Sequence, residues 1–510
     1  MMAAAPLSTR WRLAGLLDGW VDVPDTHDVP VSGLSADSRT VRPGCVFIVR
    51  RGATTDGARY IDEALRAGAV ALLRQGEPGS MLRPDGVVEV RVADVATTTG
   101  RVADRFYDHP SKDLEVVGIT GTNGKTSVSH FLAQVLSAGG TQSCGVLGTL
   151  GHGLYGALQP GELTTPDAIT VHRRLAELRA AGARRAVMEV SSHALDQGRV
   201  AGVAFDGAVF TNLTRDHLDY HGGMQAYGDA KRALFECPDL RYAAINADDA
   251  FGADLLAHAR AGVRCVAYGI DAGSGALAET GDRRWLRARI DDAAADAAIA
   301  LSISGTFGEG RLQSGLVGRF NAYNLLAALA VLLLMEWPLE AALAALATVE
   351  APPGRMQRFG GSGGEPLVVV DYSHTPDSLA RALESLRDRC AGTLWCVFGA
   401  GGDRDRGKRP MMGAAAAAHA DAIVLTDDNP RNEDGDRIIE DIRAGIPADF
   451  RTLAERDRAA AIRLALDAAA AGDVVLVAGK GHESYQESQG KRRPFSDAAA
   501  VRAALEARRS

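Results

Sequence analysis

One short stretch, a glycine-rich loop between an apolar run and a helical run, constrains the fold of this chain more than any other. The apolar run 114–120 has the composition of a buried β-strand, and the residues from Lys125 onward place apolar side chains at helical spacing. Between them, glycines stand at every third position, Gly118, Gly121 and Gly124. A strand, a tight glycine loop and a helix form a unit whose backbone N–H groups surround phosphate oxygens. The sequence therefore predicts a parallel α/β domain that binds a phosphorylated ligand.

The side chains of this loop indicate ATP or GTP as the ligand. Lys125 is suited to offset the charge of the β- and γ-phosphates, and the Thr126 hydroxyl is suited to ligate Mg²⁺. The spacing departs from the common GxxxxGK[ST] pattern, because Ile119 stands where that pattern has its first glycine. A chance glycine turn is the alternative, but the flanking strand and helix favour a nucleotide site. The predicted loop residues are Gly121, Thr122, Asn123, Gly124, Lys125, Thr126 and Ser127.

The length of 510 residues corresponds to about three domains. Residues 1–112 mix short strands and helices with polar loops, which predicts a small α/β domain. Residues 113–350 alternate strands with amphipathic helices, the pattern of a doubly wound parallel sheet. The Pro- and Gly-rich segment 351–366 is typical of a linker, after which the alternation resumes. We therefore expect an α/β protein whose third domain, residues 351–510, is Rossmann-like.

Composition and charge argue against several classes of function. A net charge of −8 and the lack of a basic block give no field for nucleic acid. Six scattered cysteines without a CxxC pair fit reduced thiols better than a disulfide or zinc framework. The longest apolar run, 325–335, is about half of a membrane span, and the N-terminal residues lack the apolar core of a secretory signal. We expect a cytoplasmic protein, monomeric, with neither nucleic acid nor membrane as a partner.

Polar residues follow two further predicted strands of the central domain. Glu189 ends one strand, and a polar loop, 211–222, that contains His217 follows another. Because ligands collect at the carboxyl ends of parallel strands, Glu189 is placed to hold Mg²⁺. A helix-capping glutamate and a merely solvated loop are the alternatives at these two positions.

The triplet spacing GxTGTNGKT resembles the Mur ligase superfamily, which includes the folylpolyglutamate synthetases. The segments MEVSSHAL, TNLTRDHLDYHG, YGDAKRALF, NADD, GRFNAYN, PGRMQRF and VVVDYSHTPDSL follow in the order of that family's motifs, and the resemblance runs from about residue 38 to 497. It is strongest to the members that add the third residue of the peptidoglycan stem peptide. The resemblance implies an ATP-dependent amide ligase that uses Mg²⁺.

The resemblance also implies roles for individual residues of the central domain. Lys125, Glu189, His217 and Lys231 would be catalytic, and Thr126, Glu189, His217 and Lys231 would attend Mg²⁺. Lys231 matches a lysine that becomes N-carboxylated in the family; a plain surface lysine is the alternative, although the chain has only six lysines. Further ATP contacts implied by the resemblance are Asn324, Arg355, Asp371 and His374.

A second set of residues matches the family's site for the nucleotide-sugar substrate, UDP-N-acetylmuramoyl-L-alanyl-D-glutamate. Ala53, Thr54 and Thr55 stand where some relatives carry His-Gln-Ala, so their side-chain contacts differ. Arg199 is suited to pair with a substrate carboxylate, with a surface salt bridge as the alternative. The whole set is Ala36, Ser38, Arg39, Gly52, Ala53, Thr54, Thr55, Thr164, Thr165, Ser191, Gln197 and Arg199.

The third domain carries the match to a site for meso-diaminopimelate. Family members that add this amino acid have the DNPR stretch ending here at Arg431, whereas those that add lysine have a neutral residue in place of the arginine. A guanidinium grips the distal carboxylate that lysine lacks. A dinucleotide fingerprint around residue 400 is excluded, because Arg404 stands where a glycine is needed. The implied pocket residues are Arg404, Asp428, Asn429, Pro430, Arg431, Gly479 and Glu483.

The sequence thus favours a ligase that joins diaminopimelate to the UDP-linked dipeptide. A relative that adds lysine to the same precursor or glutamate to folate is the nearer alternative; Arg431 and the full-length first domain argue against each. A non-catalytic nucleotide-sensing protein of the same fold is the farther one.

Overall fold

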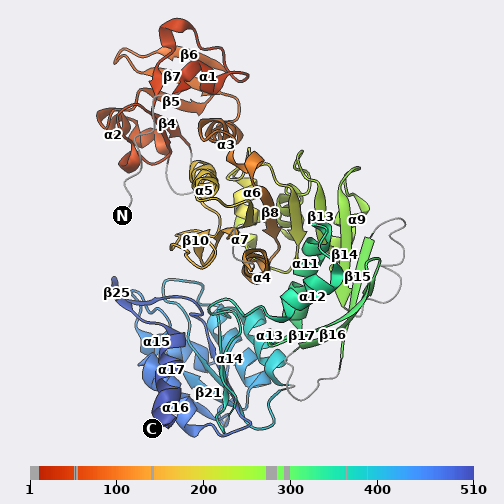
Figure 1. Cartoon of the computed structure of the whole chain (residues 1–510). Coiled ribbons are helices and arrows are strands. Elements are labelled where there is room, and N and C mark those ends of the chain that lie inside the picture. The colour runs from red at the N-terminus through yellow and green to blue at the C-terminus, as the bar shows by residue number, and fades with distance from the viewer. Residues whose placement is uncertain are drawn as a thin grey trace. The chain divides into compact units, whose positions relative to one another are not determined.

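The computed structural model of the chain describes residues 11–50, 52, 56–138, 143–270, 284–291, 299–362, 364–387 and 389–509 (Figure 1). It divides into two compact units. The first comprises Met1–Arg287, Gly305–Phe307 and Ala327–Pro338, and the second Ala288–Ser304, Gly308–Leu326 and Leu339–Ser510. No helix in these described ranges is long and apolar enough to cross a membrane.

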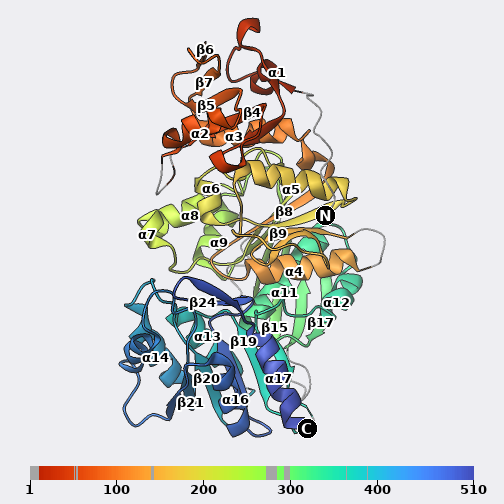
Figure 2. The ribbon, with the colours of Figure 1, turned by 90° about the vertical axis from the view of Figure 1, so that its left-hand side faces the viewer.

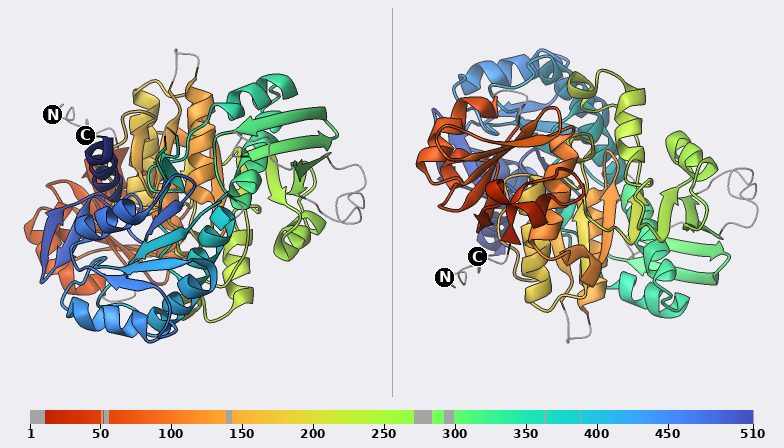
Figure 3. Two further views of the ribbon diagram at one scale, coloured as in Figure 1. Left: turned by 90° about the horizontal axis from the view of Figure 1, so that it is seen from below. Right: turned by 90° about the horizontal axis from the view of Figure 1, so that it is seen from above.

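The first unit begins with a five-stranded sheet in the order β3-β4-β5-β7-β6, in which only β6 is antiparallel (red and orange in the right-hand view of Figure 3). Alternate residues of β4 point to opposite faces: Ile48 packs with α1 and α3, and Phe47 packs with α2. The elements are β1 (Trp11–Arg12), α1 (Leu13–Leu17), β2 (Pro30–Val31), β3 (Gly33–Ser35), β4 (Cys45–Val49), α2 (Ile61–Arg66), β5 (Ala71–Gln75), β6 (Gly79–Leu82), β7 (Val88–Val92) and α3 (Val95–Phe106).

The central sheet of the first unit has the strand order β10-β9-β11-β8-β12-β13-β14-β15. All of these strands from β9 to β14 in the spatial order given are parallel, and β10 is antiparallel, so the carboxyl ends of the parallel strands share one edge. Helix α5 covers the face that carries Val116 and Met188, and Figure 2 shows α4 on the other side of β8 and β9. The elements are β8 (Glu115–Thr120), α4 (Lys125–Ser137), β9 (Gly145–Gly148), β10 (Gly151–Leu154), α5 (Ala168–Ala180), β11 (Arg185–Glu189), α6 (Ser192–Asp196), β12 (Gly207–Phe210), α7 (Leu218–His221), α8 (Met224–Arg232), β13 (Tyr242–Asn246), α9 (Ala250–Ala257), β14 (Arg264–Ile270) and β15 (Arg284–Ile290).

The second unit is built on a six-stranded sheet, β18-β19-β23-β20-β21-β22, parallel except for β18. Helices α13, α14 and α15 pack on one face, and α16 and α17 pack on the other. Its strands are β18 (Gln357–Gly360), β19 (Leu367–Asp371), β20 (Leu394–Phe398), β21 (Ala422–Leu425), β22 (Thr452–Ala454), β23 (Val474–Ala478), β24 (Tyr485–Ser488) and β25 (Lys491–Pro494). Its helices are α13 (Pro376–Arg387), α14 (Lys408–His419), α15 (Gly435–Arg443), α16 (Arg458–Ala468) and α17 (Asp497–Arg509). The remaining elements are β16 (Ile299–Gly305), β17 (Gly308–Ser314), α11 (Arg319–Leu334) and α12 (Leu339–Ala347).

The predicted α/β class and the predicted strand, loop and helix around Lys125 are confirmed. One local prediction is wrong. The segment 351–366 is not linker throughout, because Gln357–Gly360 forms β18 and pairs antiparallel with β19. A four-residue edge strand bounded by glycine carries too little periodicity to be separated from a loop.

Candidate active site

The glycine-rich loop joins β8 to α4 and requires glycine at two positions. Gly121 has φ +146° and Gly124 has φ +88°, both unfavourable for residues with a side chain. A Cβ atom on Gly121 would also collide with Thr211 Oγ1. The glycines therefore let the loop turn tightly against the end of β12 and start α4 at Lys125.

Hydrogen bonds from the neighbouring strand end hold this loop in place. Thr211 Oγ1 donates to the Asn123 carbonyl at 2.6 Å, and Asn212 Oδ1 accepts from Asn123 N at 3.0 Å. Lys125 Nζ donates to the carbonyls of Gly121 at 2.8 Å and Thr122 at 2.9 Å. The lysine charge thus lies over the loop at the N-terminus of α4, where a phosphate is favoured.

Glu189 ends β11 and is buried beside the first turn of α4. Its Oε2 accepts from Thr126 Oγ1 at 2.9 Å and from Thr149 Oγ1 at 3.0 Å, and its Oε1 accepts from Thr149 N at 2.8 Å. The structure therefore brings two predicted magnesium ligands together. Thr149 was missed by sequence reasoning, because a threonine after a short apolar strand has no distinctive signal.

The oxygen atoms of Thr126 and Glu189 fit Mg²⁺, which proteins hold with one or two carboxylates together with phosphate oxygens. Across the described ranges, no three His, Cys, Asp or Glu side chains converge as a metal cage.

The side chain of His217 contacts residues other than Thr126 and Glu189. It has φ +53° at the start of α7, is half exposed, and its Nε2 lies 3.4 Å from Asp216 Oδ2. Its ring meets the His193 ring edge-on, with centroids 4.7 Å apart. Among the contacts of the described residues, none joins His217 to Thr126 or Glu189.

Lys231 on α8 is almost fully buried, with 1% of its surface exposed, so the alternative of a plain surface lysine is wrong. Its Nζ lies 4.3 Å from the centroid of the Tyr227 ring. Burial lowers the pKa of this amine well below 10.5, and the nearby charge of Lys125 lowers it further, against an opposing effect of Asp216. A lowered pKa favours the neutral amine, which is the form that reacts with CO₂.

Several residues predicted for the dipeptide end of the nucleotide-sugar substrate gather near Glu189. Thr165 Oγ1 donates to the Glu189 carbonyl at 2.8 Å and accepts from Ser191 N at 3.1 Å. Arg199 Nη1 donates to the Thr165 carbonyl at 3.0 Å, and its Nε donates to Gln197 Oε1 at 2.9 Å. No ion pair of Arg199 occurs in the described part of the chain. Thr164 joins the same group through a 3.0 Å hydrogen bond between its hydroxyl and that of Thr149.

Tyr220 was also missed by sequence reasoning. Its hydroxyl accepts from Gln197 Nε2 at 2.9 Å and donates to Asp196 Oδ2 at 2.6 Å. It therefore fixes the amide of Gln197, which in turn holds Arg199. An aromatic residue inside a polar loop was the available signal.

The predicted uridine residues lie in the N-terminal part of the first unit. Ser38 is buried and donates to Glu63 Oε2 at 2.9 Å, whereas Arg39 is exposed and pairs with Asp37 at 2.6 Å. Ala36 and Gly52 are exposed as well. Ala53, Thr54 and Thr55 lie outside the described residues.

The second unit carries the other predicted ATP contacts. Asp371, at the end of β19, accepts from Met356 N and Ser373 N, both at 2.8 Å. The Arg355 guanidinium lies 4.6 Å from the centroid of the Tyr372 ring, and its buried Nε has no hydrogen-bond partner among the described residues. His374 is exposed next to this group, and Asn324 lies on α11, where its Nδ2 donates to Asn321 Oδ1 at 3.1 Å.

The DNPR stretch follows β21, and Asp428, Asn429 and Pro430 are buried. Arg431 has φ +52° and its Nη1 donates to the Gly402 carbonyl at 2.7 Å. Arg404, which is exposed, and Arg431 flank the same glycine, Gly401. The Arg431 guanidinium and the aliphatic stem of Arg404 thus lie on the same glycine.

Gly479 and Glu483 complete the predicted pocket from the loop after β23. A Cβ atom on Gly479, which has φ +115°, would crowd Asp428 Oδ2 at 2.5 Å, so this glycine allows the loop and the DNPR stretch to meet. Glu483 Oε2 accepts from Asn429 Nδ2 at 2.8 Å and lies 2.9 Å from Lys480 Nζ. The predicted pocket residues of the second unit therefore form one connected group.

A phosphate loop at the carboxyl edge of a parallel sheet, beside a buried carboxylate, together with a Rossmann-like unit, defines a nucleotide-dependent enzyme of the ATP-using ligase type. The chain belongs to the Mur ligase family. Family profiles match in three segments: the Mur ligase family catalytic domain at residues 30–107, the Mur ligase middle domain at 119–332 and the Mur ligase glutamate ligase domain at 354–481.

The chain is similar along almost its whole length to two curated proteins named UDP-N-acetylmuramoyl-L-alanyl-D-glutamate--2,6-diaminopimelate ligase. The one from Chromobacterium violaceum is 50% identical over 97% of this chain and 98% of its own. The one from Ectopseudomonas mendocina is 48% identical over 94% of this chain and 96% of its own. A solved structure of a protein of that name is 36% identical, with a TM-score of 0.70, and covers 96% of this chain and 100% of its own.

Proposed function

We propose that this protein is the ATP-dependent amide ligase that adds meso-2,6-diaminopimelate to the D-glutamate γ-carboxyl of UDP-N-acetylmuramoyl-L-alanyl-D-glutamate. It acts as a monomer in the cytoplasm, with Mg²⁺, in the synthesis of peptidoglycan precursors. The observation that carries the proposal is the likeness of 48–50% identity, along 94–97% of the chain, to the two proteins of that name. The Arg431 environment supports the choice of amino acid.

The first step activates a carboxylate, which is a poor electrophile. The γ-carboxylate of the dipeptide attacks the γ-phosphorus of ATP, ADP leaves and an acyl phosphate forms. Lys125 and the N-terminus of α4 offset the charge in transfer. Mg²⁺, when held by Thr126 and Glu189, would supply further charge stabilisation at the phosphate oxygens. His217 would contact this ion in the presence of the nucleotide.

Lys231 would act after modification. Its neutral amine adds to CO₂, an N–C bond forms, one proton leaves, and the head group becomes a carboxylate suited to a second Mg²⁺. Burial and the low pKa of the amine support this proposal.

In the second step the neutral amine of the amino acid attacks the acyl carbon, the tetrahedral intermediate loses the amine proton to solvent, and its C–O bond to phosphate breaks, so that phosphate leaves. Arg431, with Arg404 beside it, would bind the distal carboxylate of diaminopimelate, and Glu483 would bind its distal ammonium. Lysine lacks that carboxylate and would leave a guanidinium unpaired, which disfavours it.

A phosphate-release assay tests the proposal. With ATP, Mg²⁺ and the UDP-linked dipeptide, diaminopimelate, lysine and glutamate are supplied in parallel. We expect release with diaminopimelate to exceed release with the other two by at least about tenfold. A preference for lysine would overturn the amino-acid assignment, and ATP binding without any amino-acid-dependent release would overturn the enzymatic assignment.

A further inference from the structure

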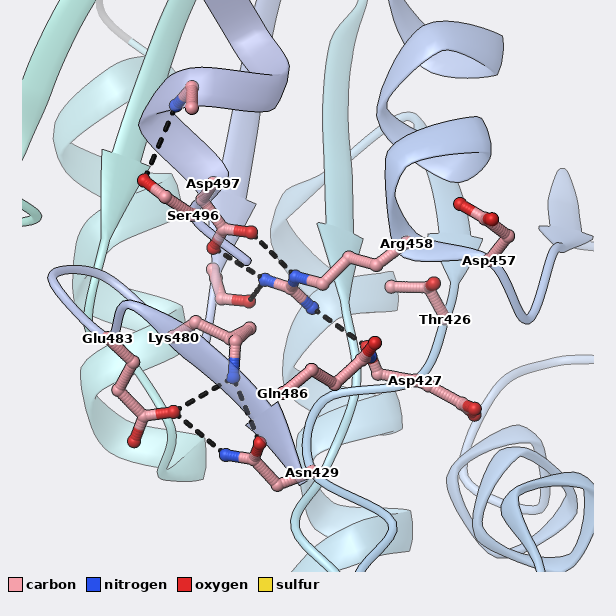
Figure 4. A network of polar contacts seen from close by, with 12 residues as sticks. Thr426, Asp427, Asn429, Asp457, Arg458, Lys480, Glu483, Gln486, Ser496 and Asp497 are labelled. Carbon is pink, nitrogen blue, oxygen red and sulfur yellow. Dashed lines mark hydrogen bonds and ion pairs between the residues drawn. The ribbon is translucent and has the colours of Figure 1, made fainter. Parts of the chain in front are cut away.

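Lys480 is a fully buried lysine beside the predicted amino-acid pocket, with no exposed surface. Its Nζ donates to Asn429 Oδ1 at 3.0 Å and to Glu483 Oε2 at 2.9 Å (Figure 4). The Tyr485 ring, with its centroid 5.8 Å from Nζ, covers another side of the ammonium. Burying a charge costs free energy unless the charge is paired and hydrogen-bonded, so these contacts offset the cost of burying Lys480.

The contacts of Lys480 fix the orientation of the Asn429 amide. Asn429 Oδ1 accepts from Lys480 Nζ and from Glu487 N at 2.9 Å, and Nδ2 donates to Glu483 Oε2 at 2.8 Å. With two donors facing the oxygen, the amide cannot flip without losing them. Lys480, Asn429 and Glu483 thus form a closed triangle, which Figure 4 shows.

The members of this triangle differ in their exposure. The side chain of Glu483 is 22% exposed, whereas that of Lys480 is 0% exposed. Both hydrogen bonds to Glu483 fall on Oε2. A ligand can therefore reach the Glu483 carboxylate but not the Lys480 ammonium, and Lys480 acts on a ligand only through Glu483.

The same frame extends to Arg431. The Glu487 N–H donates to Asn429 Oδ1, and the Glu487 carbonyl accepts from Arg431 N at 3.0 Å. Arg431 has a left-handed backbone, φ +52°, so its direction depends on such anchors. One continuous set of hydrogen bonds thus connects the backbone of Arg431, through Glu487 and Asn429, to the Glu483 carboxylate.

We propose that Lys480 is a positioning residue for the incoming amino acid, because it sets the Glu483 carboxylate in register with Arg431. The inference rests on the proposed function and names a residue outside the predicted pocket. Lys480 itself touches no substrate. Without the Lys480 ammonium, Glu483 and Asn429 can move, so the enzyme binds the amino acid more weakly. The sites for ATP and the UDP-linked dipeptide stay intact.

Steady-state kinetics of Lys480→Met test this role. The variant keeps the aliphatic stem and removes the ammonium, and Lys491→Met, at an exposed lysine of the same unit, is the matched control. We expect the KM for diaminopimelate to rise about tenfold or more, with the KM for ATP and for the dipeptide within about twofold. Lys491→Met leaves all three unchanged. A rise of all three KM values together, or of none, would overturn the proposal.

A double-mutant cycle with Glu483→Gln tests whether Lys480 acts through Glu483. The double variant should raise the KM for diaminopimelate no further than Glu483→Gln alone, because the carboxylate charge that pairs with Lys480 is then already removed. Independent, multiplicative effects would overturn the proposal. If Lys480→Met does not fold, Lys480→Leu, which also removes the donor, carries the same measurements.

The wild-type amino-acid panel separates this proposal from the proposed function. If the wild type uses lysine instead of diaminopimelate, the proposed function fails, and the KM of Lys480→Met for the amino acid that is used still tests the positioning role.

Discussion

Lys231 couples the stability of the fold to pH. Its pKa in the folded protein lies well below the ordinary 10.5, so between the two pKa values the unfolded chain binds a proton that the folded chain does not. Stability contributed by this site therefore rises with pH from the lowered folded pKa up to about 10.5 and is lowest below that window. In CO₂-free buffer, we expect the free energy of unfolding of the wild type, relative to that of Lys231→Met, to increase as the pH is raised from about 7 to 10. Urea titrations at each pH measure the difference; a difference that falls with pH would contradict it.

Arg431 should control the choice of amino acid without affecting nucleotide. Removing a bidentate partner of a carboxylate costs about 1.5–3 kcal/mol, so we expect Arg431→Ala to raise the KM for diaminopimelate about tenfold to a hundredfold. The KM for ATP should stay within about twofold. Arg381→Ala, at an exposed arginine of α13, is the control and should leave both constants unchanged. Equal losses for both substrates would mean that the pocket is wrongly assigned.

The site residues that could be predicted belong to a recognisable local motif, whereas those that were missed have partners far away in the sequence. Glu189 and Thr126 stand at fixed places relative to a strand and a glycine loop, and the structure joins them. Thr149 and Lys480 belong to short loops whose partners lie far along the chain, such as Asn429, 51 residues from Lys480. Only the folded sheet brings such pairs together, so no local pattern reveals them.

The glycine-rich loop depends on backbone geometry more than on side-chain chemistry. We expect Gly121→Ala to abolish nucleotide binding, because φ +146° disfavours a side chain and the added Cβ would collide with Thr211 Oγ1. Gly79→Ala, on strand β6 where a Cβ meets nothing within 4 Å, should bind nucleotide as the wild type does. Titration with a fluorescent ATP analogue measures both. Normal binding by Gly121→Ala would show that the loop adjusts.

The long buried elements were predictable because their apolar runs are nearly continuous. Strands β8, β20 and β23 coincide with apolar runs, which read VVGI, LWCVF and VVLVA. The short edge strand β18 was not predictable, because its four residues alternate between partly buried and exposed without a strong apolar pattern. A strand that is buried on both faces can therefore be predicted from its apolar run. A short edge strand cannot, because it forms only by pairing with its neighbour in the folded sheet.

Helices α16 and α17 are joined by a buried ion pair between Arg458 and Asp497, 2.7 Å apart and fully enclosed. Arg458 also donates to the Ala478 carbonyl at 2.8 Å, next to the Gly479 turn. Asp497→Ala leaves a buried cation unpaired, and we expect a loss of about 3–5 kcal/mol in the free energy of unfolding. Asp377→Ala, which breaks the exposed Arg381 pair, should cost less than about 1 kcal/mol. Urea unfolding compares them; equal small losses would contradict the role of burial.

At the scale of the whole molecule, the predicted substrate residues are divided between the two compact units. Every residue predicted for the UDP-linked dipeptide falls within Met1–Arg287, and every residue predicted for diaminopimelate falls within Leu339–Ser510. A ligand that binds only the folded state stabilises the unit that holds its site. Each substrate should therefore stabilise a different unit, and so shift a different thermal unfolding transition.

Differential scanning calorimetry of the intact chain measures this division. At about one hundred times its Kd, each ligand contributes about 2.7 kcal/mol, enough to move the transition of its own unit by several degrees. We expect the UDP-linked dipeptide to raise the transition of the first unit and diaminopimelate to raise that of the second. Arg431→Ala should abolish the second shift and keep the first. A single transition that both ligands raise equally would contradict the division, because the two sites would then share one cooperative unit.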